Sequence, residues 1–398
     1  DFRTKNLSIS ATKYLYPKNS ETEFDYEKFL YVLRKLTTIE NIDSKISLSL
    51  SGGMDSRVLF ALMLQNKTND WNAHTFGEPE HPDSLIAGKI SAAFNVPHSR
   101  LFDDEFSSEI LIEEIQDYVG QTAVNNPISA VLQLRNYYPL KNKNVFLIDG
   151  GFGEIWRSEF FNKIIFAGRK DLTDKNHVKI FKHLKYPHPE IFNKEIKEKM
   201  YSGALEAVIQ IMETLPSPAE LGVEKWLDLF SLNSRLLNLY GPEQTRLDGI
   251  APGYMPFVQL PASNFLFAVN EIEKRNSKLF RRIITNLEPA LKKFPLVKGN
   301  VSHPFYFGSL QKRIYSKIVG KTKPQKAYPS EILFRKKLDA FIGDILFSLE
   351  VKNCSYYDKK KIEALKKDFK QNVETISSDL DWFISFELYR RSVGRKTG

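Results

Sequence analysis

The sequence contains only one cysteine, Cys354, among its 398 residues. One cysteine cannot form an intramolecular disulfide, so we expect a reducing compartment, the cytoplasm, and a core role for Cys354. No apolar run reaches the roughly 20 residues that a membrane-spanning helix needs. The first residues, Asp1 to Lys5, lack the features of a signal peptide, and a start without Met suggests that upstream sequence was removed or lies elsewhere. His74, His81, His98 and His303 lack metal-ligand spacing, which makes a zinc site an unfavoured interpretation.

Acidic residues are almost missing from one segment, Lys274 to Lys326. It contains 14 Lys or Arg residues, and Glu288 is its only acid, whereas the whole chain has a net charge of +9. The positive charge is therefore local. A segment of this kind can bind a triphosphate, a nucleic acid or an acidic partner, or can be an ordinary solvated helical surface, and charge alone does not decide between them.

The apolar pattern changes along the chain. Up to about residue 160, short apolar runs at 46–50, 71–76, 101–102 and 145–148 predict strands, with helices expected at 24–36, 58–64, 84–94, 106–118 and 130–138. This alternation predicts an α/β fold with a doubly wound parallel sheet, whose ligands bind at the carboxyl ends of the strands. Helical periodicity then dominates at 204–215, 223–239, 265–272, 278–287 and from residue 330 onward. We therefore expect a short strand or stub at 1–20, a nucleotide-binding core at 21–160, and a mainly helical region at 161–398 that completes the active site.

One loop carries the most specific signal. Ser51-Gly52-Gly53-Met54-Asp55-Ser56 follows the apolar run at 46–50 and precedes a helical stretch. Glycines let backbone N–H groups approach anionic oxygens, and the helix presents its positive end to them. The two serines add hydroxyl donors, and the Asp55 carboxylate is a suitable ligand for Mg²⁺. The loop predicts a phosphate site.

The loop resembles the pyrophosphatase loop of the adenine nucleotide α-hydrolase-like enzymes. Further segments are similar to the synthetase domain of the asparagine synthetase family, in the same order along the chain. They are His74 to Gly77 with Pro82 to Ala87, Val145 to Trp156, Met255 to Gln259, and the basic run that ends at Pro295 to Gly299. The resemblance spans roughly residues 40–305.

The resemblance implies an amide ligase that uses ATP and Mg²⁺. A substrate carboxylate would attack ATP to give an acyl-adenylate and pyrophosphate, and an amine or ammonia would then form the amide and release AMP. Leu50, Phe76, Gly77 and Ile148 match the adenine-contacting positions, although Phe76 and Ile148 also read as ordinary core residues. Ser51, Gly52, Gly53, Ser56 and Gly151 would hold the phosphates, with Lys298 as a mobile point charge.

The second signature of the family is altered in this chain. Asp149-Gly150-Gly151-Phe152-Gly153-Glu154 stands where the family has approximately SGEGxDE, so the magnesium-binding aspartate is replaced by Gly153 and the acid of the amine step by Gly150. Asp149 or Glu154 could complete a metal site with Asp55 and assist catalysis. Alternatively, Asp149 only caps the turn and Glu154 is structural. Gln259 replaces an aspartate of the family as well.

The N-terminal glutaminase domain of asparagine synthetases has no counterpart in the sequence, so we expect no glutamine hydrolysis. The expected partners are a small-molecule or peptide carboxylate and a separate donor of amine or ammonia; a membrane and a nucleic acid are disfavoured. Two other functions stay open. A catalytically weakened homologue could bind nucleotide as a scaffold, and, less favoured, a tRNA-modifying enzyme could use the basic segment.

Overall fold

The computed structural model describes residues 23–39, 43–66, 70–102, 106–121, 126–162, 164–184, 190–299, 301–322 and 329–396. The short strand or stub expected at residues 1–20 lies outside these residues. The first part of the chain forms the following elements: α1 Tyr26–Thr37, β1 Lys45–Ser49, α2 Met54–Leu64, β2 Trp71–Phe76, α3 Pro82–Ala93, β3 His98–Leu101, α4 Ser108–Gln121, η1 Ile128–Ala130, α5 Val131–Arg135, η2 Tyr138–Leu140, β4 Val145–Ile148 and η3 Gly153–Arg157.

The remainder of the described chain is mainly helical. Its elements are η4 Ile164–Gly168, α6 Arg169–Thr173, α7 His177–Leu184, α8 Lys194–Glu213, α9 Pro218–Leu221, α10 Val223–Asn233, η5 Leu236–Tyr240, α11 Gly241–Asp248, β5 Gly253–Tyr254, η6 Pro256–Val258, α12 Leu260–Ser263, α13 Glu271–Lys274, η7 Arg275–Ser277, α14 Lys278–Leu287, η8 Pro289–Lys293, β6 Leu296–Lys298, β7 Val301–His303, α15 Ser309–Thr322, α16 Pro329–Lys337, α17 Asp339–Leu346, α18 Leu349–Asn353, α19 Lys359–Gln371 and α20 Ser378–Lys396. No helix of the described ranges has both the length and the apolar character needed to cross a bilayer.

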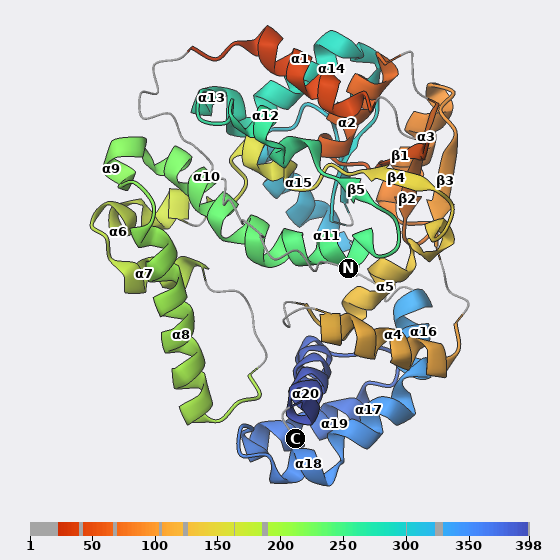
Figure 1. The fold of residues 1–398 in the computed structure, drawn as a ribbon, viewed down its shortest axis with the longest axis vertical. Helices are drawn as coiled ribbons and strands as arrows, with labels where there is room; N and C mark the ends of the chain where they lie inside the picture. Colours follow the sequence, from red (N-terminus) through yellow and green to blue (C-terminus); the bar gives the residue numbers. More distant parts are fainter. Residues whose placement is uncertain are drawn as a thin grey trace, which may run out of the picture.

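The central sheet is parallel and has the strand order β3-β2-β1-β4-β5 (Figure 1). The α/β fold class predicted from the sequence is therefore confirmed, as is the helical C-terminal region. The order reverses between β1 and β4, because β2 and β3 lie on one side of β1 and the later strands lie on the other. In open α/β sheets, ligands bind at such a reversal, outside the carboxyl ends of the strands.

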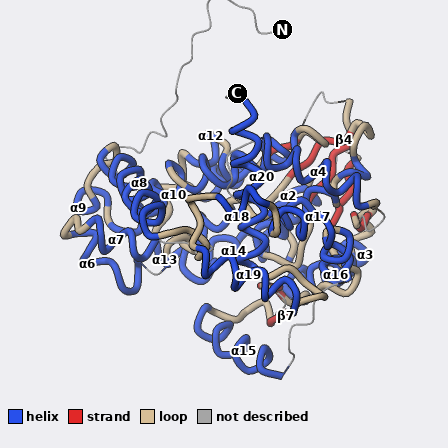
Figure 2. Tube along the Cα trace, turned by 90° about the horizontal axis from the view of Figure 1, so that it is seen from below, coloured by secondary structure: helices blue, strands red, loops and turns tan. Residues whose placement is uncertain are grey.

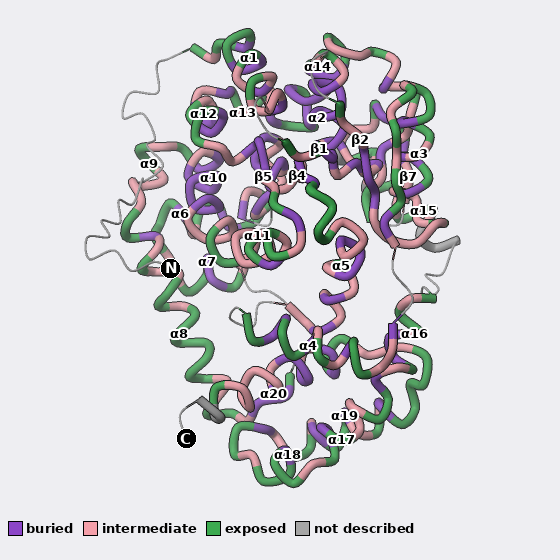
Figure 3. The backbone as a smooth tube through the Cα atoms, turned by 45° about the vertical axis from the view of Figure 1, so that its right-hand side comes forward, coloured by how far each residue is buried: buried purple, intermediate pink, exposed green. Residues whose placement is uncertain are grey.

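Both faces of the sheet are covered. On one face, Ile46 and Leu48 of β1 pack in the largest core with side chains of α1, α2, α3 and α14. On the other face, Leu147 of β4 packs in a smaller core with Tyr137 and Ala251. The strands at the centre of the sheet are accordingly buried (Figure 3).

A second core lies in the C-terminal region. Helices α16 to α20 pack against α4 and η1, and together they bury a continuous apolar cluster that includes Ile115, Leu338 and Phe383. Figure 1 shows these blue helices grouped below the sheet, beside the earlier helix α4. Helix α15 follows a different course and stands away from the body of the molecule (Figure 2).

Some predicted elements were wrong in extent or type. The helix expected at 265–272 does not form, and the chain makes a series of turns there instead. The Asn270 side chain accepts the N–H of Ile272 and so caps the start of a separate helix, α13. The helix expected at 223–239 is interrupted at Ser234: α10 ends at Asn233, and the π-helix η5 follows at Leu236–Tyr240. Ser234 Oγ donates to the Phe230 carbonyl, 2.6 Å away, and such side-chain bonds compete with the backbone ladder.

Strands β2 and β4 match their predicted ranges, whereas the shortest strands were missed and the third strand was misplaced. The third strand starts at His98 rather than at Leu101, and the helix expected at 130–138 is divided into η1, α5 and η2. The two-residue strand β5 and the hairpin of β6 and β7 had no prediction. Two or three residues are too few for an alternating pattern, so pairing with neighbours decides these segments.

Candidate active site

The loop at residues 51–56 lies at the carboxyl end of the central strand β1 and leads directly into α2. Its serines bind one another: the Ser51 N–H donates to Ser56 Oγ at 3.1 Å, and the two hydroxyl oxygens are 3.0 Å apart. The N–H of Gly53 donates to Ser51 Oγ at 3.1 Å. Gly53 is also the N-cap residue of α2 and has no side chain with which to cap the helix. The positive end of α2 thus opens at the sheet edge.

Strand β6 is fixed onto this loop. The N–H of Val297 donates to the Gly52 carbonyl at 2.9 Å, and a Cβ at Gly52 would come within 2.3 Å of the Val297 side chain. Glycine is therefore required at residue 52 for this close contact. The next residue of the strand is Lys298, so the backbone contact places the predicted lysine beside the loop.

A buried arginine, which the sequence analysis missed, supports the same arrangement. Arg57 is fully buried in α2, and its guanidinium donates to the carbonyls of Phe294 at 2.8 Å, Pro295 at 2.7 Å and Gly52 at 3.2 Å. Its five donors allow one side chain to bind several carbonyls at once. Arg57 therefore joins the loop, α2 and the segment that carries Lys298.

The glycine-rich turn after β4 packs against the first turn of α2. A Cβ at Gly150 would lie 2.9 Å from the Ser56 nitrogen, and one at Gly153 would lie 2.5 Å from Cγ of Asp55. Backbone therefore fills the space at the two positions where the sequence resemblance led us to look for acidic side chains. The two predicted loops do lie together, but the second one presents glycine rather than carboxylate to the first.

Asp55 is held by an arginine that the sequence analysis did not single out. Arg157, the last residue of η3, donates from Nε to Asp55 Oδ1 at 2.8 Å and from Nη2 to Oδ2 at 2.7 Å. Its remaining nitrogen, Nη1, lies 2.5 Å from Glu159, whose other oxygen lies 3.2 Å from Nζ of Lys298. A chain of alternating charges thus runs from the loop to Lys298.

The charged side chains of this series influence one another's pKa values. Burial raises the pKa of Asp55 to about 7, and Arg157 opposes that rise. Burial also acts to raise the pKa of Glu159, but Arg157 and Lys298 together hold it below its usual range. Lys312 of α15, a further residue that the sequence analysis did not select, adds a cation near Glu159, and burial lowers its pKa to about 8.

The predicted magnesium ligands do not fit a magnesium site in this arrangement. Both oxygens of Asp55 accept hydrogen bonds from Arg157, and Asp149 Oδ1 accepts the N–H of Gly151 at 2.6 Å. Asp149 thus caps the turn through Oδ1. Across the ranges that the structure describes, no three acidic, histidine or cysteine side chains gather as a metal-binding group. Glu154 lies near Asp55 and raises its pKa, and it also acts electrostatically on Arg157.

A carboxylate already occupies one donor of the loop. The N–H of Gly52 donates to Oδ1 of Asp83, at 2.7 Å, from the first turn of α3. Burial raises the pKa of Asp83, whereas this hydrogen bond lowers it. The side chain of Asp83 therefore stands where the sequence analysis expected a phosphate oxygen.

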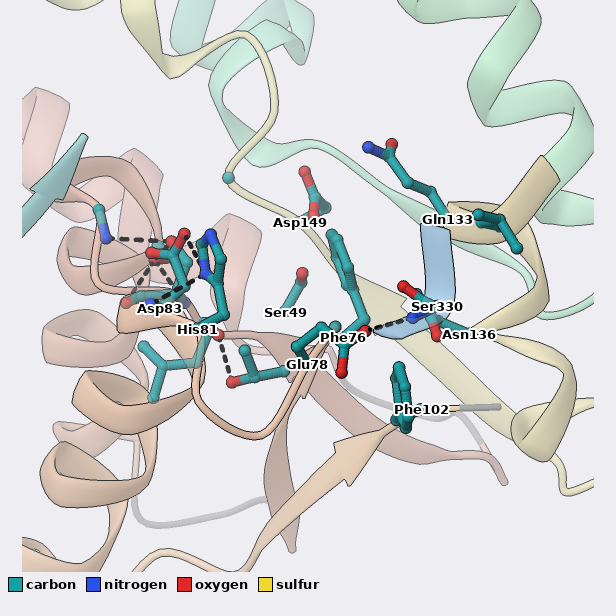
Figure 4. A pocket seen from close by; sticks show the side chains of 18 of the residues that line it. Ser49, Phe76, Glu78, His81, Asp83, Phe102, Gln133, Asn136, Asp149 and Ser330 are labelled. Atoms are coloured by element: carbon teal, nitrogen blue, oxygen red, sulfur yellow. Dashed lines mark hydrogen bonds and ion pairs between the residues drawn. The ribbon is translucent and has the colours of Figure 1, made fainter. Parts of the chain in front are cut away.

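A cavity of about 580 Å³ opens beside the loop (Figure 4). Many of the predicted nucleotide-binding residues line it: Leu50, Ser51, Gly53, Asp55, Ser56, Phe76 and Gly77, together with Asp149, which was predicted as a catalytic and metal-binding residue. Ile148 is fully buried in the sheet, in agreement with its alternative interpretation as a core residue. The described lining residues do not include Gly52, Gly151, Glu154 or Lys298.

The far wall of the cavity comes from elements that the sequence analysis did not connect with the site. Its described polar residues are Ser129, Gln133 and Asn136, near α5, and Ser330 and Glu331 at the start of α16. The Ser330 N–H donates to Glu78 at 3.0 Å, which joins α16 to the loop after β2 (Figure 4). The helical C-terminal region thus closes the cavity on the side opposite the loop.

The basic segment is not a uniform exposed surface. Lys274 is buried and its Nζ lies 2.6 Å from Asp228, while Arg275 lies 3.2 Å from Glu224. Arg281 donates to the carbonyls of Phe305 and Phe307. At least three of its cations therefore contact other parts of the fold, whereas Lys298 is 68% exposed beside the loop.

Comparisons with known proteins leave the function to be argued from this geometry. No protein-family model matches the chain, and no curated protein matches its sequence. Among solved structures, the chain is similar to the U34-tRNA thiolase NcsA from Methanococcus maripaludis, which was solved with its [4Fe-4S] cluster. The two share 13% identity over 84% of this chain and 86% of that chain, with a TM-score of 0.30.

Proposed function

We propose that the protein is an ATP-dependent ligase that forms an amide through an acyl-adenylate. One observation carries the proposal: the loop at residues 51–56 opens at the reversal point of a parallel sheet, into a cavity, with the strand of Lys298 bound to its backbone. The sequence resemblance to amide-forming enzymes supplies the reaction class.

The proposed reaction has two steps. A carboxylate oxygen of the substrate attacks the α-phosphorus of ATP, and the bond from that phosphorus to the oxygen of the leaving pyrophosphate breaks. An amine then attacks the acyl-adenylate, the carbon–oxygen bond breaks, AMP leaves with its electrons, and the amine loses a proton. The barrier to the first step depends on stabilising the charge that develops on pyrophosphate.

The described residues divide these tasks between them. The N-terminus of α2, with the hydroxyls of Ser51 and Ser56, would hold the leaving phosphates, and Lys298 would supply mobile positive charge. Leu50, Phe76 and Gly77 would contact the adenine. Asp149 lines the cavity, and burial raises its pKa, so we assign it the role of the general base that accepts the proton of the attacking amine.

A second candidate function is nucleotide binding without turnover. It is favoured by the carboxylate of Asp83 on the Gly52 N–H and by the ion pair between Asp55 and Arg157. Both contacts use groups that an adenylating enzyme would turn toward ATP and its cation. A protein of this kind would retain a saturable ATP site and would release no AMP.

Product analysis separates the two candidates. The protein is incubated with α-labelled ATP, hydroxylamine as the amine, and a series of acids: aspartate, a peptide, a β-amino acid and a sugar acid. A ligase yields AMP, pyrophosphate and a hydroxamate with at least one of these acids, and Lys298→Ala should reduce the rate about 100-fold. Lys293→Ala removes an exposed lysine of the same segment and should leave the rate unchanged. Saturable binding without AMP formation from any acid would favour the second candidate.

A further inference from the structure

The cation at Asp55 is a guanidinium that belongs to the protein. We infer that Arg157 takes the place of a divalent cation at this loop, so that the loop binds phosphate groups without magnesium. The inference rests on the proposed phosphate site. Its main support is the two-point contact described above, in which Nε and Nη2 of Arg157 lie 2.8 and 2.7 Å from the two oxygens of Asp55. A planar guanidinium matches a carboxylate in this way, whereas a lysine offers only a point charge.

The local backbone is built to bring Arg157 to this position. Phe152 and Ser158, which flank η3, have left-handed backbones with φ of 62° and 50°. Such conformations are unfavourable for residues other than glycine and persist only where the surroundings impose them. Phe152 is fully buried, and the centroid of its ring lies 4.8 Å from that of Phe160 and 4.9 Å from that of Tyr240. Aromatic packing therefore holds the turn that presents Arg157, whose side chain is only 10% exposed.

The same turn leaves no room for a second carboxylate. At Gly153, a Cβ would meet Cγ of Asp55 at 2.5 Å and Oδ1 at 2.7 Å. At Gly150, a Cβ would meet the nitrogen of Ser56 at 2.9 Å. Glycine at these two positions allows the turn to close onto α2 and allows Arg157 to reach Asp55. The glycines at positions 150 and 153 and the contact of Arg157 with Asp55 therefore depend on each other.

The ion pair changes the charge that an incoming phosphate meets. Alone, Asp55 would repel phosphate, and a divalent cation would have to screen it. Arg157 neutralises Asp55, and Lys298 in turn neutralises Glu159, 3.2 Å away. These four side chains sum to zero charge, while Glu154 adds one negative charge near Asp55 and Lys312 adds one positive charge close to Glu159. The site therefore carries its own counter-charge.

Titration calorimetry with ATP and with inorganic pyrophosphate tests the inference, in EDTA and in excess Mg²⁺. The wild-type protein should bind each ligand with a Kd that differs less than about threefold between the two conditions. Arg157→Ala should weaken binding in EDTA at least about tenfold, and Mg²⁺ should restore part of the loss. Arg157→Lys keeps the positive charge but loses the planar, two-point contact of the guanidinium, so its Kd in EDTA should lie between those of the wild type and Arg157→Ala.

The outcomes are distinct. Wild-type binding that is more than tenfold tighter in Mg²⁺ would reject the inference and leave the phosphate site intact. No binding in either condition would reject the proposed function and the inference together. Circular dichroism and thermal unfolding report whether each variant is folded, and if Arg157→Ala does not fold, the wild-type comparison and Arg157→Lys still decide.

Discussion

At the scale of single residues, the glycines of the two loops determine which charges meet. Because Gly52 has no side chain, Val297 can pack against it, which brings the next residue, Lys298, beside the loop. Gly153 likewise leaves room for the carboxylate of Asp55. The glycines and the motif order were visible in the sequence. The partner of Asp55 was not, because Arg157 lies 102 residues away in the chain and nothing in its local pattern distinguishes it from a surface arginine. Buried ion pairs of this type depend on tertiary packing, which sequence periodicity does not encode.

Asp83 gives a prediction at the same scale. Replacing it with alanine frees the N–H of Gly52 and removes one negative charge from the cavity wall. We expect ATP and pyrophosphate to bind about tenfold more tightly, a change of about 1.4 kcal/mol. Calorimetric titration measures this change, with Asp117→Asn, which removes an exposed charge on α4, as the control. Weaker binding by Asp83→Ala would show that Asp83 assists the ligand rather than competing with it.

At the scale of elements, the strands at 71–76 and 145–148 and the helix at the start of the chain were predicted closely, whereas the strands of two or three residues were not. The helix expected at 24–36 is α1, and its N-cap, Asp25, accepts the N–H of Lys28 at 2.9 Å. By contrast, β5 and β6 have two and three residues, and both are fixed by neighbours: β4 for one, and the loop at Gly52 for the other. The far wall of the cavity could not be predicted either, because it unites α5 with α16, which are distant in the sequence.

The contact between α20 and η1 gives a prediction about pH. Burial raises the pKa of Asp381 to about 6, although Ser129 donates to the carboxylate twice. In the folded protein Asp381 therefore keeps a proton that the unfolded chain releases above its ordinary pKa of 3.8. Its contribution to stability is fully present below pH 3.8 and is lost as the pH rises through about 6, a loss of up to about 3 kcal/mol.

Asp381→Asn removes this titration. The free energy of unfolding of the wild type, minus that of the variant, should fall by up to about 3 kcal/mol between pH 4 and pH 7. Urea unfolding at several pH values measures this difference. Asp379→Asn, at an exposed position of the same helix, should show no such slope. A difference that stays constant, or that grows with pH, would contradict the proposed burial penalty.

At the scale of the whole molecule, the sheet and the C-terminal helices share one cavity. The loop after β1 forms one wall and the start of α16 forms the other, and the Ser330 N–H bridges to Glu78 between them. A ligand that fills this cavity contacts both parts of the chain. The sequence boundary at about residue 160 separates a strand-rich part from a helical part, whereas β5, from the later part, completes the sheet.

This shared cavity leads to a prediction about amide hydrogen exchange. ATP should slow amide exchange in the first turn of α2 and, at the same ligand concentration, in the first turn of α16. Helix α8, whose residues do not line the cavity in the described structure, serves as the internal control. Protection confined to α2 would mean that the C-terminal helices do not enclose the ligand.

Equilibrium dialysis with labelled ATP tests the central claim, that the loop at residues 51–56 binds the phosphates of a nucleotide. The account predicts one saturable site per chain, from which inorganic pyrophosphate displaces ATP completely. Absence of saturable binding, or ATP that adenosine displaces but pyrophosphate does not, would contradict it.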